Sequence, residues 1–402
     1  MGIPGFLEAC EEVQKLWNLK AYAAENNYQP NEMMRVGVDA KVVIKGCSTT
    51  SAAKDSFIAT LESFVRVLGL YSTVPMAFVF VFDGPDRPSI KSNIQVESID
   101  PLLYSKARQL LDVFCYPSIT APGDAHSFFA ALTNTAVIDA VISDDADLLL
   151  LGVPLLFRKA PRSDAYDLSL TYNIYSSENI QQKLKLTRGG MILAALLMGS
   201  DYDTRGVTGC GLKTAMGIAS QTTLGDQLLN NYRTFASATE YLTESLDIWR
   251  DQIRLEVAHN PTGNLSRRRQ CVAAAITDNF PNLRILEFYS GRLAPKVHQN
   301  KMALLQPRMP DLLKLVAICQ EVFAWTDKTL YDRFKEYKIW GGIVTRMLAS
   351  PSVMYDKKTK TFYDRALQLS SSRVHGMKCS MACPRPMQLS PWILLLRTWG
   401  ST

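Results

Sequence analysis

The sequence predicts an α/β protein in which a mainly parallel sheet, flanked by helices, is followed by a mostly helical region. Over 34–160, short apolar runs alternate with segments of helical period, which is typical of strand–helix–strand units. From Met191 onward, the apolar residues recur at helical spacing instead. We therefore expect one domain at 1–190, a helical region at 191–350, and an irregular tail at 351–402, where the hydrophobic period fades.

The expected elements follow the apolar runs in order. Runs rich in β-branched and aromatic residues predict strands, and runs with apolar residues every three or four positions predict helices. Strands are predicted at 34–44, 76–84 and 137–147. Helices are predicted at 57–71, 104–115, 125–134, 191–199, 212–220, 224–242, 312–325 and 330–348. Because ligands of such sheets bind at the carboxyl ends of the strands, the residues that end these runs are the first candidates for a site.

Composition bounds the classes of function. The chain has 402 residues, 44 Lys+Arg against 38 Asp+Glu, and a net charge of +6, an excess that fits an anionic partner without requiring one. Its longest uncharged apolar runs fall well short of the ~20 residues that a membrane span needs, so no membrane partner is expected. Its 8 cysteines are scattered and lack the density of a secreted disulfide scaffold. We expect a soluble, intracellular protein.

Acidic residues follow the predicted strands. Asp39 ends the first run, Asp83 the second, and Asp145 with Asp147 the third, which brings carboxylates from three strands to one edge of the sheet. Carboxylate oxygens are the ligands that Mg²⁺ and Mn²⁺ prefer, and two such ions about 4 Å apart can hydrolyse phosphodiesters. Any single aspartate after a strand is more often a turn or cap residue, and that alternative stays open. With the acids of neighbouring turns included, the candidate metal ligands are Asp39, Asp83, Asp124, Asp145, Asp147 and Asp201.

A glycine-rich loop forms a second candidate site. Three glycines lie within 206–211, and the helix that follows offers Lys213 and Thr214 in its first turn. The backbone N–H groups of such a loop, together with the dipole of the following helix, can bind a phosphate. Glycine spacing alone is a weak signal, but Asp201 lies just upstream of this loop. We therefore interpret the segment as a phosphate contact beside the acidic site.

Taken together, these segments resemble the XPG / flap-endonuclease superfamily of structure-specific nucleases. The resemblance runs from Met1 to about Ala219, with the motifs in the superfamily's order and at its intervals. Three further segments within 264–334 resemble the Holliday-junction resolvase branch. The motifs are MGIPGF, GVDAKVVI, VFVFDGPDRPSIK, APGDAHSFFAAL, DAVISDDADLLLLG and LLMGSDYDTRGVTGCGLKTA, then NLSRRRQCVAAAI, FPNLRILEFY and VFAWTDKTLYDRF.

The resemblance implies a PIN-like nuclease core of the 5′–3′ exonuclease type, followed by a helix-two-turn-helix and a helical C-terminal region. It implies an endonuclease that cuts flapped or branched DNA with two Mg²⁺ ions, or Mn²⁺, and with no small-molecule cofactor. It also implies a role in DNA repair or recombination in the nucleus. Because resolving a four-way junction needs two cuts, a resolvase would form a transient dimer on DNA.

By motif position, the resemblance assigns roles to single residues. Asp145 and Asp147 would be catalytic, together with Lys91 near the scissile phosphate, and Gly2 would bring the amino end of the chain close to the site and to the DNA. The arginine triplet at 267–269 is either a contact to the DNA backbone or a solvated loop. The implied metal ligands are Asp39, Asp83, Asp124, His126, Asp145, Asp147 and Asp201, and the implied DNA contacts are Gly2, Gly209, Gly211, Lys213, Arg267, Arg268 and Arg269.

The chain departs from the superfamily at one of these positions. Where the superfamily has Ala-Pro-Gly-Glu-Ala-Glu, this chain has APGDAH, so Asp124 is one methylene shorter and His126 replaces a carboxylate. Imidazole is a poor ligand for Mg²⁺, and even a supporting group at a metal site is worth on the order of 10–100-fold in affinity or activity. The segment after Lys91 also lacks the expected run of basic residues. Three alternatives stay open: an active nuclease, a degenerate paralogue that binds branched DNA or a partner without cutting, and a PIN nuclease that cleaves RNA.

Overall fold

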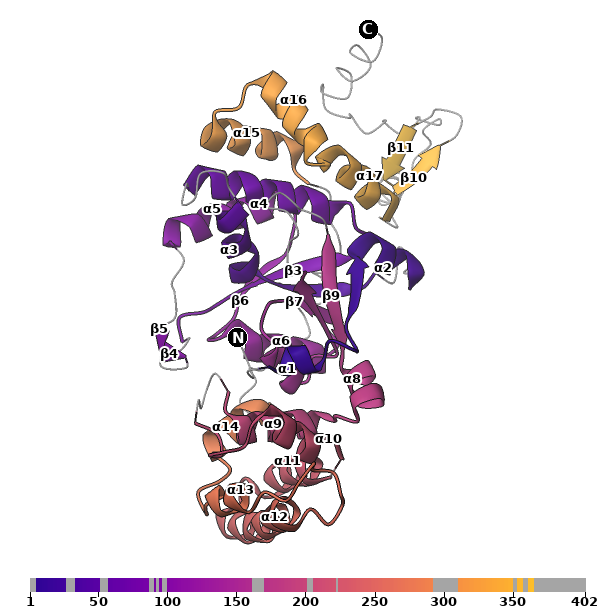
Figure 1. Cartoon of the computed structure of the whole chain (residues 1–402). Coiled ribbons are helices and arrows are strands. Elements are labelled where there is room, and N and C mark those ends of the chain that lie inside the picture. Colours follow the sequence, from indigo (N-terminus) through magenta and orange to yellow (C-terminus); the bar gives the residue numbers. More distant parts are fainter. Residues whose placement is uncertain are drawn as a thin grey trace, which may run out of the picture.

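A seven-stranded sheet forms the centre of the computed structural model, with the strand order β1-β9-β8-β7-β2-β3-β6 (Figure 1). The structure describes residues 5–26, 33–50, 57–86, 90–91, 94–95, 100–160, 170–200, 205–221, 223–291, 310–349, 353–356 and 361–364. The strands of the sheet are β1 (Lys15–Asn18), β2 (Arg35–Asp39), β3 (Ala77–Phe82), β6 (Ser118–Thr120), β7 (Ala140–Ile142), β8 (Leu155–Lys159) and β9 (Thr171–Ser176).

The sheet is mainly parallel, as predicted. Strands β8, β7, β2, β3 and β6 run parallel to one another, whereas β9 pairs antiparallel with β8 and β1 antiparallel with β9. The central strands are buried on both faces, which explains why they read as continuous apolar runs. In β3, Val79 and Val81 face one hydrophobic core, and Phe78, Phe80 and Phe82 face the other.

Helices cover both faces of the sheet (Figure 1). Helices α3, α4 and α5 lie on one side, and α1, α6 and α7 on the other. The helices of the core are α1 (Phe6–Ala9), α2 (Leu19–Glu25), α3 (Ala40–Thr50), α4 (Phe57–Ser72), α5 (Pro101–Val113), α6 (Ala125–Asn134), α7 (Asp147–Leu150) and α8 (Ser177–Leu184). Two small hairpins complete the described chain, β4 (Ile90–Lys91) with β5 (Ile94–Gln95), and β10 (Val353–Asp356) with β11 (Thr361–Asp364).

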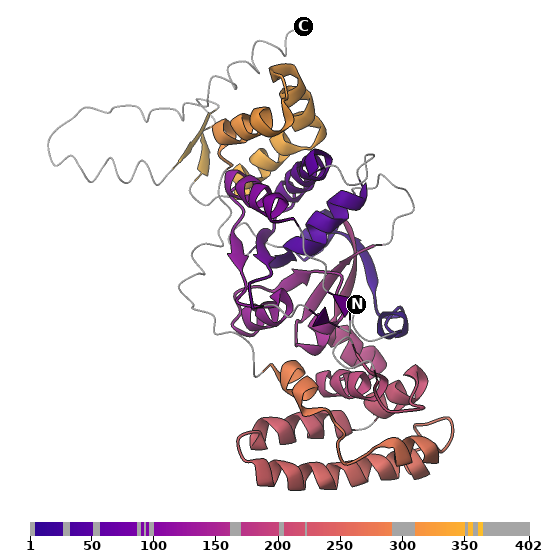
Figure 2. The same cartoon turned by 90° about the vertical axis from the view of Figure 1, so that its left-hand side faces the viewer.

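The remaining helices form two groups at opposite ends of the molecule, a separation seen in both views (Figures 1 and 2). The first group shares the hydrophobic core of α6 and α7, and the second shares the core of α4 and α5. The first group is α9 (Arg188–Met198), α10 (Leu212–Gln221), α11 (Leu224–Phe235), α12 (Thr239–His259), α13 (Gln270–Ala275) and α14 (Leu283–Ser290). The second group is α15 (Leu312–Phe323), α16 (Asp327–Glu336) and α17 (Ile339–Ala349). The domain limits at 190 and 350 stay predictions, but the helices between them do not form one cluster.

Arg188 joins the first helical group to the core. Its Nε donates to the carbonyl of Leu150 at 2.8 Å, and its Nη2 donates to the carbonyls of Leu151 and Tyr289 at 3.0 and 2.8 Å. These are carbonyls at the end of α7 and α14, which a short helix leaves without an intrahelical partner. The start of α9 therefore fixes the position of α7, the helix that begins at Asp147.

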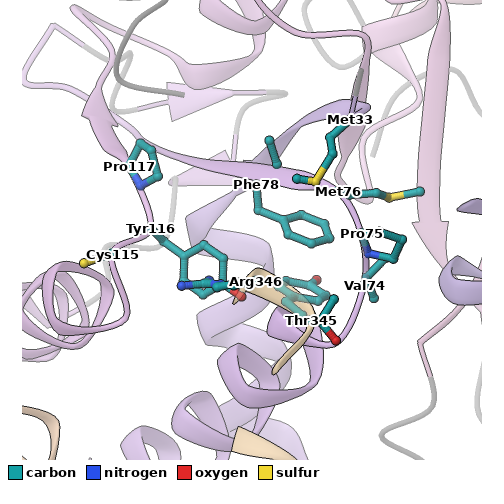
Figure 3. A pocket seen from close by; sticks show the side chains of 12 residues that line it. Met33, Val74, Pro75, Met76, Phe78, Cys115, Tyr116, Pro117, Thr345 and Arg346 are labelled. Carbon is teal, nitrogen blue, oxygen red and sulfur yellow. The ribbon is translucent and has the colours of Figure 1, made fainter. Parts of the chain in front are cut away.

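The second helical group packs closely on α4. A Cβ at Gly69 would lie 2.4 Å from the carbonyl oxygen of Tyr337, so only glycine allows this approach. Beside this contact, the guanidinium of Arg346 lies 4.2 Å from the ring centroid of Tyr116, next to Phe78 (Figure 3). The cavity between these side chains measures about 20 Å³, room for about one water molecule, and is part of the packing.

Several predicted elements differ from the observed ones. The run at 34–44 is a strand only to Asp39, because Asp39 accepts a hydrogen bond from the backbone N–H of Val42 at 3.3 Å and so caps α3. The run at 330–348 breaks at Lys338, whose φ of +61° ends the helix. Within the described residues, no helix is both long and apolar enough to cross a membrane.

Candidate metal centre and nucleic-acid interface

The structure brings five of the predicted acids to the carboxyl edge of the sheet. Asp39 is the last residue of β2, and Asp83 follows β3 directly. Asp145 and Asp147 follow β7, which lies beside β2 in the sheet. Asp124 caps the N-terminus of α6, and the backbone N–H of the next residue donates to Asp83 at 3.1 Å. We call Asp39, Asp83, Asp124, Asp145 and Asp147 the acidic cluster.

Hydrogen bonds hold the ends of β2 and β7 together. Ser143 donates from its hydroxyl to Oδ2 of Asp39 at 3.0 Å. The backbone N–H of Asp145 donates to the hydroxyl of Ser143 at 3.3 Å, and that of Asp147 donates to Oδ1 of Asp145 at 3.1 Å. These bonds fix the turn between β7 and α7 and orient its carboxylates. Sequence reasoning missed Ser143, although its place at the start of the S-D-D-A-D turn was a signal for it.

Three of these carboxylates are almost fully buried. Asp39, Asp145 and Asp147 expose 5%, 1% and 0% of their surface. Adjacent buried carboxylates repel one another and lose their hydration, so such an arrangement needs a positive charge close by. The burial of these acids therefore indicates that a positive group must lie beside them.

His126 lies inside the acidic cluster. Its Nδ1 lies 2.8 Å from Oδ1 of Asp124, and its Nε2 lies 3.6 Å from Oδ2 of Asp39 and 3.5 Å from Oδ2 of Asp145. Burial alone would lower the pKa of His126, but the charges of Asp124 and Asp145 outweigh burial and raise this pKa well above its usual value of 6.5. The imidazole thus lies between three carboxylates, which favour its charged form.

The donor chemistry of the acidic cluster fits a divalent metal ion, with one exception. Five carboxylates are the oxygen ligands that Mg²⁺ or Mn²⁺ takes, whereas the imidazole of His126 is a poor ligand for Mg²⁺. Within the part of the chain that the structure describes, no group of three His, Cys, Asp or Glu side chains has the geometry of a metal site. Because the ring nitrogens of His126 lie 2.8–3.6 Å from oxygens of Asp39, Asp124 and Asp145, a metal ion held by these three carboxylates would require the imidazole to turn away.

The structure describes three of the predicted site residues only in part or not at all. Gly2 and Asp201 lie outside the described residues, and for Lys91 the structure gives only the backbone, in β4. The proposed roles of these residues stay predictions.

The predicted DNA contacts that lie within the described residues gather around the turn between α9 and α10. Gly209 has a φ of +79°, a left-handed conformation that glycine adopts without strain. A Cβ at Gly209 would lie 3.6 Å from Val272, so α13 packs beside this turn. Gly211 directly precedes α10, and Lys213 lies in the first turn of that helix. Arg269 precedes α13 in the same way.

Basic side chains of this region are accessible. Lys213, Arg267 and Arg268 are exposed, whereas Arg269 is partly buried, with its backbone N–H bonded to the carbonyl of Val257 at 2.9 Å. Exposed cations beside a glycine turn and a helix N-terminus can contact a phosphate backbone without reading bases. The geometry therefore supports an electrostatic contact to nucleic acid at this end of the molecule.

Comparisons with known proteins match the segment that carries several of these acids. The XPG I-region family matches residues 116–201, a segment that includes Asp124, His126, Asp145 and Asp147. The DNA excision repair protein ERCC-5 of Mus musculus is 27% identical over 243 residues, 59% of this chain and 19% of its own length. The flap endonuclease GEN-like 1 of Oryza sativa subsp. japonica is 28% identical over 234 residues, 50% of this chain and 36% of its own length. The chain thus matches well under half of the length of these relatives.

Solved structures share the fold. A eukaryotic junction-resolving enzyme GEN-1 superimposes with a TM-score of 0.70 at 22% identity, covering 89% of this chain and 82% of the other. The catalytic core of Rad2 in complex with DNA substrate superimposes with a TM-score of 0.56 at 20% identity, covering 83% of this chain and 99% of the other. The resemblance inferred from the motifs is confirmed: the chain carries an XPG I-region within the fold of the GEN1 and Rad2 nucleases.

Proposed function

We propose that the chain is a structure-specific DNA endonuclease that binds flapped or branched DNA in the nucleus and hydrolyses a phosphodiester bond with divalent metal ions. The burial of Asp39, Asp145 and Asp147 side by side at the ends of β2 and β7 carries this proposal. The relatives support it, since their names describe flap endonucleases, an excision repair protein and junction-resolving enzymes.

Different residues of the chain would bind the metal ions, orient the acids and bind the DNA. Asp39, Asp83, Asp124, Asp145 and Asp147 would hold the metal ions, which activate water and stabilise the leaving oxygen when bound. Ser143 keeps Asp39 and Asp145 oriented through its two hydrogen bonds. Lys213 and the arginines before α13 would bind the phosphates of an uncut duplex, which fixes the DNA in register. On a four-way junction, two copies would make the two cuts.

Cleavage of defined DNA tests this proposal. End-labelled 5′-flap and four-way junction DNA are incubated with the wild type and with a variant carrying both Asp145→Asn and Asp147→Asn, in Mg²⁺ and in Mn²⁺. We expect wild-type cleavage near the branch, and a loss of at least about 100-fold in the double variant, because amides cannot replace the carboxylate charge. Product lengths locate the cut. Equal cleavage by the folded double variant would overturn the proposal.

A second function is favoured by one observation. The imidazole of His126 lies between the carboxylates of Asp39, Asp124 and Asp145, where its charged form would balance part of their charge. A chain with this arrangement can keep the fold and the DNA contacts while it no longer cuts. It would then act as a module that binds branched DNA or a protein partner.

Binding measured beside cleavage separates the two functions. Fluorescence anisotropy with the same labelled junction reports affinity without chemistry. Tight binding by the wild type, with no cleavage in Mg²⁺ or Mn²⁺, would establish the binding module. Absence of binding to flapped and four-way DNA would contradict both the nuclease and the DNA-binding module, and would leave only a module that binds a protein partner.

A further inference from the structure

A row of exposed apolar side chains runs along α12, the longest helix that the structure describes (Figure 1). Tyr241, Ile248 and Leu255 expose 64%, 58% and 55% of their surface, although Ile and Leu are mostly buried in folded proteins. Each follows the previous one by seven residues, about two turns of a helix, so the three side chains share one face. We call Tyr241, Ile248 and Leu255 the outer stripe. None of the roles assigned above uses it.

The fold does not need the outer stripe for its own packing. The opposite face of α12 carries a second set of apolar residues, at the spacing of three or four that a helix packed on a core shows. These core residues are Leu242, Leu246, Trp249, Ile253 and Val257. A helix at a protein surface normally carries one apolar face, and α12 carries two. The outer stripe is therefore free to contact another molecule.

Neighbouring segments hold α12 in place. Arg250 donates from Nε to the carbonyl of Phe280 at 2.7 Å, and Arg254 donates from Nε to the carbonyl of Ile276 at 2.9 Å. Both arginines thus fix α12 to the chain that follows α13. A partner would therefore meet a preformed surface, which lowers the entropic cost of binding.

Carboxylates follow one side of the outer stripe. Glu240, Glu244, Asp247 and Asp251 are exposed, and their alternating spacing of four and three residues places them in one row along α12. Asp247 and Asp251 each contact the arginine three positions further along the helix. Among the described residues, no ion pair includes Glu240 or Glu244. We call these four residues the acidic row.

The acidic row excludes two kinds of occupant. It repels the phosphates of nucleic acid, although the chain as a whole has a net charge of +6. A second copy also fits poorly. Two α12 helices that met antiparallel would oppose their acidic rows, and two that met in parallel would place each row against the uncharged Ser245 and Gln252 of the other.

A basic helix fits both features of this surface. Its apolar side chains would pack between those of the outer stripe, as residues of two facing helices do. Lysine or arginine along one edge of that helix would lie against Glu240 and Glu244, whose charges no other described residue pairs.

We propose that the outer stripe and the acidic row form a docking surface for a helix of a partner protein, one with apolar residues at helical spacing and Lys or Arg along one edge. Recognition of an amphipathic helix by its apolar face is a common mode of protein binding. The proposal does not depend on the nuclease function, since it uses none of the residues assigned to metal or DNA.

Two synthetic peptides of the length of α12 test the proposal. Both carry leucines at the same helical spacing, and they differ only in having lysine or glutamate along one edge. Fluorescence anisotropy of the labelled peptides with the full chain gives each Kd. We expect the lysine peptide to bind at least about tenfold more tightly than the glutamate peptide, because like charges across an interface oppose binding.

Substitutions in the outer stripe test the apolar contact. In a variant with Ile248→Ser and Leu255→Ser, the Kd for the lysine peptide should rise by at least about tenfold, because two apolar contacts are lost. The matched control is Leu313→Ser with Val344→Ser, which removes two exposed apolar side chains at the opposite end of the molecule. Its Kd should equal that of the wild type. An unchanged Tm shows that each variant folds.

Substitutions in the acidic row test the charge contact. Glu240→Gln with Glu244→Gln should raise the Kd for the lysine peptide by about threefold, the effect of losing weak surface ion pairs. The dependence of this Kd on salt should fall as well, since salt screens exposed charges.

Three outcomes overturn the proposal. The first is failure of the lysine peptide to bind the wild type, and the second is an equal Kd for the two peptides or for the wild type and the Ile248→Ser, Leu255→Ser variant. The third is self-association of the wild type in sedimentation velocity that this variant lacks, which would assign the surface to a second copy. Binding of flap DNA measured beside the peptides tests the proposed function separately, because the proposal on α12 makes no use of it.

Discussion

The Nδ1 atom of His126 lies 2.8 Å from Oδ1 of Asp124. The same carboxylate oxygen accepts a hydrogen bond from the backbone N–H of His126 at 2.7 Å, because Asp124 caps α6. The imidazole is therefore held at the first turn of the helix, with Nε2 directed to Asp39 and Asp145. The histidine that stands at position 126, where the superfamily has a carboxylate, thus lies among the carboxylates of the acidic cluster and not at its edge.

His126→Glu is expected to increase cleavage in Mg²⁺ by at least about tenfold, because it replaces a poor Mg²⁺ ligand by an oxygen donor. A sixth carboxylate also adds repulsion, so Mg²⁺ should raise the Tm of this variant more than that of the wild type. Rates on 5′-flap DNA and thermal unfolding with and without Mg²⁺ measure the two effects.

His126→Gln is the matched control, since glutamine has the length of glutamate without its charge. It should show neither the faster cleavage nor the larger gain in Tm. Equal behaviour of the Glu and Gln variants would contradict the role that we give to charge at this position.

The arginines before α13 are expected to set part of the salt dependence of DNA binding. In a variant with Arg267→Ala and Arg268→Ala, the slope of log K against log salt should become shallower by about 0.9 for each phosphate that the protein no longer neutralises. The matched control removes two exposed lysines of α16, Lys328 and Lys335, which lie at the opposite end of the molecule. Anisotropy titrations at several salt concentrations give the slopes. Identical slopes for both variants would contradict a contact between these arginines and DNA phosphates, and would show that the arginines are solvated.

The sequence predicted the central strands β2, β3 and β7 because parallel strands that are buried on both faces consist of continuous apolar residues. It did not predict β1 and β9, which pair antiparallel at the sheet edge and mix polar with apolar residues. The sequence did not predict the start of helix α3, because the β-branched side chains of Val42 and Val43 favour a strand.

The acids of the candidate site were predictable because the ends of parallel strands meet at one edge of the sheet. The place of His126 was not predictable. The sequence shows the replacement, but the distances of its ring to Asp39 and Asp145 depend on β2 and β7 being neighbours and on the cap of α6. A pocket between α3, α4 and the ends of β7, β8 and β9 was not predictable either, because residues far apart in the sequence line it.

Cysteine reactivity is expected to follow burial. Burial raises the pKa of Cys10 to about 12 and that of Cys319 to about 12, whereas Cys271 is exposed. Only the thiolate reacts, and at pH 8 a thiol with such a pKa is ionised in about one molecule in ten thousand. Iodoacetamide should therefore modify Cys271 in the native protein, and Cys10 and Cys319 only after unfolding. Peptide mass spectrometry assigns each site, and rapid native modification of Cys319 would show that α15 does not stay packed.

Two glycine-to-alanine substitutions are expected to change stability in opposite directions. Gly46→Ala should raise the free energy of unfolding by about 0.5–1 kcal/mol, because glycine weakens a helix and the new methyl group meets no atom within 4 Å. Gly69→Ala should lower it by about 1–3 kcal/mol, because its Cβ would lie 2.4 Å from the carbonyl oxygen of Tyr337. Guanidinium unfolding followed by tryptophan fluorescence measures both changes, and Trp325 and Trp340 report on the helices that pack on α4. If Gly69→Ala stabilised the protein as much as Gly46→Ala, the close contact between α4 and the turn before α17 could not exist in solution, since the gain in helix propensity is the same for both.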